Sequence, residues 1–234
     1  MINIRRSNDR GHAEHGWLDS FHTFSFGDYH DPRFMGFRKL RVINEDRVLG
    51  GEGFGAHPHR DMEIISYVLE GELEHKDSMG TGSVIHPGDV QLLSAGSGVT
   101  HSEFNHSKKE KVHFFQIWVV PAKVGLKPSY QQKTFSEKDK KDRLCLIVSP
   151  EGKDGALKIH QDVFLYASIL NKSQDLSYLL KKDRHVWVQV IKGSIVLNDK
   201  VLKEGDGASV SEEVSLQFFN KSLDSSEFLL FDLN

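Results

Sequence analysis

Cysteine and long apolar segments are scarce in this chain, and their scarcity excludes several classes of protein. The single cysteine, Cys145, cannot form a disulfide within the chain, and its apolar neighbours predict a buried, inert thiol. No apolar run reaches the length of about 18 residues that a transmembrane helix needs. The first six residues also lack the apolar core of a signal peptide. We therefore expect a cytoplasmic protein that does not enter membranes.

Charge of one sign is also missing. Lysine and arginine number 30 and acidic residues 33, which gives a formal net charge of -3. Such a balance offers no electrostatic basis for attraction to a phosphate backbone, so we expect no direct binding of nucleic acid. The charged segment 138–143 mixes both signs and is typical of a solvated linker.

Long amphipathic helices are absent, and short strand-like runs take their place. Segments 64–69, 90–93 and 112–120 are rich in β-branched and aromatic residues, and Gly71 and Gly88 mark turns after or before them. Strands that recur at intervals of about 10 residues are typical of a sandwich or barrel. The sequence therefore predicts an all-β protein.

Histidine is abundant, with 13 residues, and four side chains stand out. They form two pairs, His57-Pro58-His59 and His101-Ser102-Glu103. Side chains at i and i+2 of a strand leave the same face, so each pair can present two ligands in one direction. Three imidazoles and one carboxylate around one point suit a divalent first-row metal and leave room for water, dioxygen or substrate.

Chance is the alternative explanation for a His-x-His pair, because most histidines in proteins bind nothing. The glycines around the pairs argue against chance: Gly51 and Gly71 flank the first, and Gly88, Gly96 and Gly98 precede the second. The pattern also contains a second acid, Glu63, which three residues separate from the first pair. From the residues alone, Glu63 and Glu103 compete as the fourth ligand.

This glycine frame resembles the two signature motifs of the cupin superfamily. The amino-acid sequences of segments 53–63 and 91–103 resemble those of the pirin family, and so do the sequences of segments 16–26, 36–44 and 229–233. The resemblance spans nearly the whole chain and is closest to bacterial pirin-like bicupins described as quercetin 2,3-dioxygenases. The chain departs from the general cupin pattern in spacing, which is longer by one residue between Glu63 and Gly71 and by about two before His101.

The resemblance implies a metal site and a fold. Its ligands correspond to His57, His59, His101 and Glu103, which leaves Glu63 without a direct bond to the metal. The implied fold is a pair of cupin-type (jelly-roll) β-barrels, a metal-binding one at 1–134 and one without metal ligands at 135–234.

A weak internal repeat supports two barrels. Segment 68–73 is echoed at 190–195, and the Gly-Asp pair at 88–89 is echoed at 205–206. These offsets place four residues that are not metal ligands opposite the four candidate ligands, namely Leu179, Lys181, Phe218 and Asn220. The sequence therefore predicts no metal site in the second barrel.

The function that the resemblance implies is a metal-dependent dioxygenase that cleaves quercetin or a related flavonol with O2 and releases carbon monoxide. Glu103 would be both metal ligand and catalytic base. Iron is the expected ion, although Mn, Co, Ni, Cu and Zn accept the same ligands. Two alternatives share this site: a pirin-like regulatory protein with a protein partner, and a cupin isomerase or hydrolase that uses the metal as a Lewis acid.

Several further side chains are candidates for the surroundings of the metal. His75 and Asp77 follow a strand of the first barrel and can support a ligand from behind. Aromatic and apolar residues near the pairs can line a pocket for a flat molecule, although at alternating strand positions they more often form core. They are Phe54, Met62, Phe104, Phe115, Ile117 and Trp118.

Overall fold

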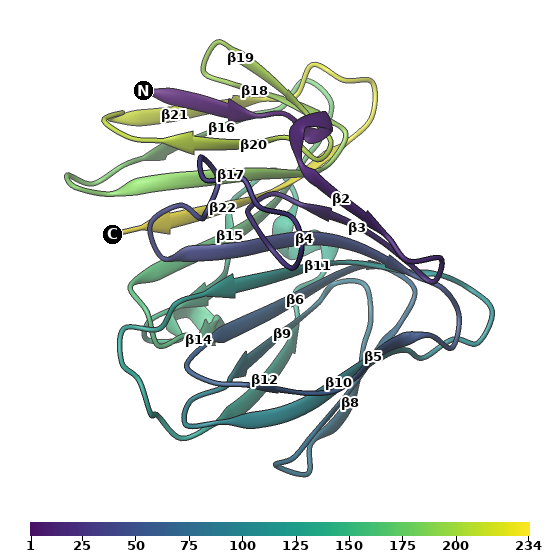
Figure 1. Ribbon diagram of the computed structural model, residues 1–234. Helices are drawn as coiled ribbons and strands as arrows, with labels where there is room; N and C mark the ends of the chain where they lie inside the picture. Colours follow the sequence, from purple (N-terminus) through teal and green to yellow (C-terminus); the bar gives the residue numbers. More distant parts are fainter. The chain divides into compact units, whose positions relative to one another are not determined.

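The structure, a computed structural model, describes residues 1–234, and its regular secondary structure is almost entirely β-strand (Figure 1). Its only α-helix, α1, spans Glu137–Lys140. The expected all-β class is therefore confirmed. No helix has the length and apolar character needed to cross a membrane. Two compact units make up the chain: an N-terminal barrel of Gly11–Phe135 and Ile159–Gln161, and a C-terminal barrel of Met1–Arg10, Ser136–Lys158 and Asp162–Asn234.

The N-terminal barrel contains two antiparallel sheets. Its strands are β2 (Gly11–Glu14), β3 (Leu18–His22), β4 (Leu40–Val48), β5 (Gly53–His59), β6 (Glu63–Glu70), β7 (Leu73–Asp77), β8 (Gly82–Ile85), β9 (Asp89–Ser94), β10 (Val99–Asn105), β11 (Val112–Val119) and β12 (Ser129–Thr134). Seven strands form one sheet in the order β12-β9-β6-β11-β4-β3-β2, and four form the other in the order β5-β10-β7-β8. The expected strands at 64–69, 90–93 and 112–120 are confirmed as β6, β9 and β11.

Alternation along the strands builds the core of this barrel. In β10 the residues at odd positions from Val99 to Asn105 are buried, whereas those between them are more exposed. Side chains of both sheets therefore meet in one interior. One apolar cluster of this barrel joins residues of β3, β4, β6, β7, β8 and β11, namely Leu18, Val48, Val68, Leu73, Ile85, Val112 and Phe114.

The C-terminal barrel repeats this architecture. Its elements are β1 (Ile2–Arg5), β13 (Cys145–Ser149), β14 (Leu157–Lys158), β15 (Val163–Leu170), β16 (Asp175–Leu179), β17 (His185–Lys192), β18 (Ser194–Leu197), β19 (Lys200–Lys203), β20 (Gly207–Val210), β21 (Ser215–Phe219), β22 (Ser226–Leu233), and the short 3-10 helices η1 (Ser7–Asp9) and η2 (Lys153–Gly155). The sheet orders are β1-β20-β17-β22-β15-β13-β14 and β16-β21-β18-β19. Cys145, expected to be buried, is only partly buried at the start of β13.

One strand explains why the units do not follow the expected division at 134/135. In the N-terminal barrel the edge position beside β9 is filled by β12. In the C-terminal barrel the same position beside β20 is filled by β1, which pairs from Ile2 with Val210 to Arg5 with Gly207. The first ten residues therefore belong to the C-terminal barrel, although the change of unit at Phe135 lies one residue from the expected boundary.

Two asparagines fix the correspondence between the barrels. The Asn105 side chain donates to the carbonyls of Val48 and Glu110, and the Asn220 side chain donates to those of Leu170 and Asp224. Asn220 therefore corresponds to Asn105.

This correspondence corrects the second offset from the sequence by two residues. The C-terminal counterparts of His101 and Glu103 are Leu216 and Phe218, not Phe218 and Asn220. Both counterparts are apolar and fully buried.

Candidate metal centre

The pairing of β5 with β10 brings the two sequence pairs together. His101 lies opposite His57, and Val99 lies opposite His59. Beyond His101 the register shifts, so that Glu103 lies opposite Phe54. An irregularity of this kind bends the strand and changes the direction of a side chain, and such features are common beside active sites. Pro58 is tolerated because β5 is an edge strand, as its lack of an N–H donor predicts.

Three imidazoles converge at this place. The Nε2 atoms of His57 and His101 lie 3.1 Å apart. The ring of His59 lies 4.7 Å from that of His57 and 4.8 Å from that of His101, measured between centroids. One nitrogen from each ring lies within 4.8 Å of one nitrogen from each of the other two rings. The three histidines can therefore share one ion.

Glu103 lies beside this group and is 2% exposed. Its Oε2 accepts a hydrogen bond of 2.6 Å from the Gln116 amide, and its Oε1 accepts one of 3.2 Å from the Ser66 hydroxyl. A carboxylate has about four lone-pair positions, so these bonds leave room for a metal. A carboxylate oxygen of Glu103 lies within 4.8 Å of ring nitrogens of His75 and His101. Glu103 is therefore a neighbour of His101 but not a member of the group formed by the three converging histidines.

A chain of hydrogen bonds behind His101 fixes its tautomer. The Asp77 carboxylate accepts from the Met79 and Thr81 amides and lies 3.0 Å from Nε2 of His75. Because a carboxylate only accepts, Nε2 of His75 carries a proton. When His75 carries only this proton, its Nδ1 is an acceptor, 3.4 Å from Nδ1 of His101. In that state the proton of His101 stands on Nδ1, which leaves the Nε2 lone pair facing the centre.

A different hydrogen bond orients His57, with the same result as for His101. Its Nδ1 lies 2.7 Å from the carbonyl of Gly55 and donates to it, so its Nε2 also carries a lone pair. Two lone pairs then face each other across 3.1 Å, an arrangement that a cation between them would stabilise. The set of His75, His101 and Glu103 suits an ion less well, because both nitrogens of His75 are already engaged.

Electrostatics keep His59 and His101 neutral. Burial, together with the neighbouring imidazoles, lowers the pKa of His59 to about 4 and that of His101 to about 3. Only neutral imidazole binds a metal. The residues present therefore fit a divalent ion: three imidazole nitrogens lie together, and the Glu103 carboxylate lies beside one of them, that of His101.

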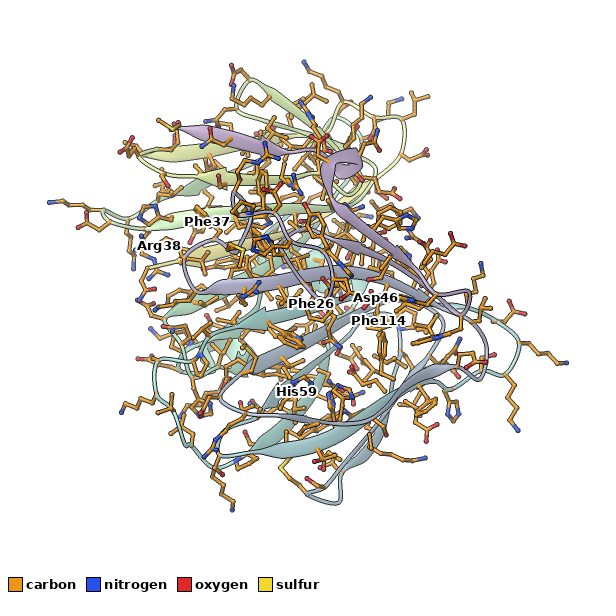
Figure 2. The ribbon with its side chains drawn as sticks, viewed as in Figure 1. Phe26, Phe37, Arg38, Asp46, His59 and Phe114 are labelled. Atoms are coloured by element: carbon orange, nitrogen blue, oxygen red, sulfur yellow. The ribbon has the colours of Figure 1, made fainter.

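A cavity of about 460 Å³ opens beside the candidate ligands. That volume is within the range of pockets for small organic molecules. One side is aromatic, and Trp118 meets both Phe26 and His59 edge to face, at 5.4 Å and 4.9 Å between centroids. Asp46 and His59, labelled in Figure 2, reach the cavity from β4 and β5, which belong to the two different sheets.

The aromatic candidates from the sequence divide into three groups. Phe54 and Trp118 line the cavity, as proposed for a pocket. Phe115 and Ile117 are fully buried core, and Met62 packs on another apolar cluster. Phe104 is exposed on the surface.

Sequence reasoning missed the polar lining of the cavity, which includes Ser20, His22, Asn44, Asp46 and Gln116. Ser20 and His22 share the inward face of β3 with Leu18. Polar residues at alternating positions with a core leucine were a usable signal, because a buried polar group needs a reason.

Glu63 does not join the group. Its carboxylate accepts from the Ser94 hydroxyl at 2.9 Å and lies 3.3 Å from Nδ1 of His160. Burial raises the pKa of Glu63. Its hydrogen bonds connect β6 with β9 and with segment 159–161, which is a structural role.

The chain belongs to the pirin family. The family model described as Pirin matches residues 3–119, and that described as Quercetinase C-terminal cupin domain matches residues 146–233. The expected fold of two cupin barrels is thereby confirmed.

Similar proteins cover the chain from end to end. A quercetin 2,3-dioxygenase of Escherichia coli K12 is 47% identical over 100% of this chain and 99% of its own length. A pirin-like protein of Caulobacter vibrioides is 36% identical over 99% of both. The crystal structure of the bacterial pirin YhhW from Escherichia coli, in complex with nickel(II), superposes with a TM-score of 0.95 at 47% identity and covers 100% of this chain and 99% of that one.

We predict one metal ion per chain, lost when two ligands are removed together. The variant His57→Ala/His59→Ala should stay folded, because both side chains are only partly buried, and should bind less than a tenth of an equivalent of Ni²⁺. Elemental analysis after gel filtration measures this. The matched control is His86→Ala/His106→Ala, two exposed histidines of the same barrel. A full equivalent in the first variant would contradict the site.

Metal affinity should depend weakly on pH. Two imidazoles with ordinary pKa values near 6.5 would lose about 15-fold in affinity between pH 8 and pH 6, because the proton competes with the metal. His59 and His101 remain neutral over that range. We expect the Kd for Ni²⁺, measured by calorimetry, to rise less than about fivefold. A rise above 15-fold would show that these imidazoles titrate normally.

The hydrogen bonds that link Asp77, His75 and His101 should strengthen metal binding. In Asp77→Asn the amide can donate to His75, so both tautomers of His101 become accessible. Loss of such a support typically weakens metal binding by about 10- to 100-fold. Titration with Ni²⁺ and a melting curve would separate affinity from folding. Glu74→Gln is the control, because Glu74 lies on the same strand and contacts the exposed His106. Equal affinities of the two variants would refute the tautomer argument.

Proposed function

We propose that the protein is a metal-dependent dioxygenase that cleaves quercetin or a related flavonol. The observation that carries this proposal is the position of Glu103: its carboxylate lies within reach of His101, one of the three converging histidines, and also lines the cavity. A flavonol bound there would place its acidic hydroxyl against a base. The similarity to quercetin 2,3-dioxygenases over the whole chain supports the same substrate class.

The proposed ligands are His57, His59, His101 and Glu103. A divalent ion held there would stabilise the deprotonated, electron-rich flavonol and mediate its reaction with O2. We propose iron as the resident ion in the cytoplasm, with nickel, bound by the similar bacterial pirin, as the alternative. Metal analysis after anaerobic purification distinguishes them.

The chain's own residues would perform three tasks. Glu103 takes the hydroxyl proton of the substrate, and Gln116 holds the carboxylate in place through its 2.6 Å bond. The aromatic side of the cavity, which includes Phe54 and Trp118, packs on a flat ring. The hydrogen-bonded chain from Asp77 keeps His101 in its binding tautomer. The overall reaction consumes O2, opens the central ring of the flavonol and releases carbon monoxide.

Substitution Glu103→Gln tests the proposal. The amide keeps a similar shape but cannot take a proton, so turnover per bound metal should fall by roughly 10²-fold or more. Quercetin decay, O2 uptake and carbon monoxide release are measured at matched metal content. Glu63→Gln is the control, because Glu63 is an equally buried carboxylate that lies outside the group.

Equal rates per metal in wild type and Glu103→Gln would remove Glu103 as the base. No O2 uptake by the wild type with any flavonol, whichever of the candidate metals is loaded, would reject the dioxygenase itself.

A further inference from the structure

A polar track crosses the floor of the cavity, away from the imidazoles. It begins at Gln116, which donates to Glu103. Gln116 lies directly opposite Asn44 in the pairing of β11 with β4. Residues directly opposite in antiparallel strands have Cβ atoms about 5 Å apart and share a face. Asn44 therefore lies one strand further from Glu103 than Gln116 does.

The track continues on β3 and on the next inward position of β4. Asp46 follows Asn44 by two residues, and its carboxylate accepts a 2.5 Å bond from the Ser20 hydroxyl. The Ser20 hydrogen is thereby committed, so the 2.9 Å contact to His22 is a bond that His22 Nε2 donates. Ser20 and Asp46 thus form a fixed pair rather than a mobile surface group.

Asn44 differs from the other residues of this track because its side-chain oxygen has no hydrogen-bond partner. The side chain is only 3% exposed, lines the cavity, and has an Oδ1 atom with no hydrogen-bond partner. A buried acceptor without a donor costs roughly 1 to 3 kcal/mol, and such groups are rare in folded proteins. A small adjustment of the Asn44 side chain, which lines the cavity, would let a donor on a bound ligand satisfy this acceptor.

The charges around the cavity narrow the chemistry of that ligand. No lysine or arginine lines it, whereas Asp28, Asp46 and Glu103 do. Burial, with Glu103 and Glu45 adding negative charge, raises the pKa of Asp46 to about 7. At the end of the cavity away from the candidate metal centre, a phosphate or carboxylate would lie beside acidic groups with no lysine or arginine to pair with, so an uncharged donor such as a hydroxyl is favoured there.

We infer that Asn44, with the Ser20–Asp46 pair beside it, forms a recognition site for a phenolic hydroxyl remote from the metal-binding end of the substrate. The inference rests on the proposed function, since it assumes that a flavonol occupies the cavity. It adds that the protein selects polyhydroxylated flavonols over those without hydroxyls on their outer rings. A site built to hydrogen-bond a hydroxyl rejects the analogue that lacks it, because its buried polar atom then stays unpaired.

Two ligands and a set of variants test this site by binding alone. Zinc-loaded protein is titrated with quercetin and with 3-hydroxyflavone, which keeps the metal-binding hydroxyl and ketone but lacks every remote hydroxyl. The readout is the ratio of the two Kd values. In Asn44→Leu, or Asn44→Ala should the first not fold, the preference for quercetin should fall by about tenfold relative to wild type. Asn44→Asp keeps an oxygen acceptor and should retain the preference.

Phe54→Leu is the control, because Phe54 lines the same cavity without a hydrogen-bonding group. It should weaken both ligands and leave the ratio unchanged. If both flavonols bind but Asn44→Leu keeps the wild-type ratio, or Phe54→Leu changes it equally, the recognition site is refuted while the proposed function stands. If neither flavonol binds to any form, the proposed function fails and the site fails with it.

Discussion

The pairing of β5 with β10 is the constraint on which the candidate metal centre depends. Strand alternation turns His57 and His59 to one side of β5, and His101 and Glu103 to one side of β10, but only the observed register brings the two pairs together. A slip of one residue would turn one pair outward. The neighbouring β7 completes the arrangement, since His75 lies opposite Glu103 and Asp77 lies opposite His101. Three adjacent strands therefore supply the ligands and the support of one of them.

The sequence indicated the four candidate ligands because the spacing within each pair matches the period of a strand, and a period of two is a local property. It also predicted the possible role of His75 and Asp77. It could not predict Asn44, Asp46 or Gln116, because their position in the cavity depends on pairings between strands far apart in the chain.

The repeat between the barrels shows the same limit. Its existence was visible in two short echoes, but the offset was wrong by two residues at the second motif. Loop lengths change between the barrels, so an offset taken at Gly88 does not hold at His101. The exchange of β12 for β1 could not be predicted either, because ten N-terminal residues carry no signal for a partner about 200 positions away.

The comparison of the barrels shows two different interiors within one architecture. The four-stranded sheets and the four central strands of the seven-stranded sheets have equivalent orders, and Asn105 and Asn220 make equivalent bonds to the carbonyls of their own barrels. At the positions of His101 and Glu103 the C-terminal barrel has Leu216 and Phe218, both fully buried. The scaffold thus tolerates either a polar or an apolar interior, since backbone pairing determines the fold and side chains determine the chemistry.

X-ray absorption at the metal edge of anaerobically purified protein tests the central claim most directly. Our account predicts a first coordination sphere with three imidazole nitrogens and at least one carboxylate oxygen, and a spectrum that does not change in His75→Gln beyond a lower occupancy. The loss of one imidazole from the wild-type spectrum in His75→Gln would place the ion between His75, His101 and Glu103, and would contradict the account.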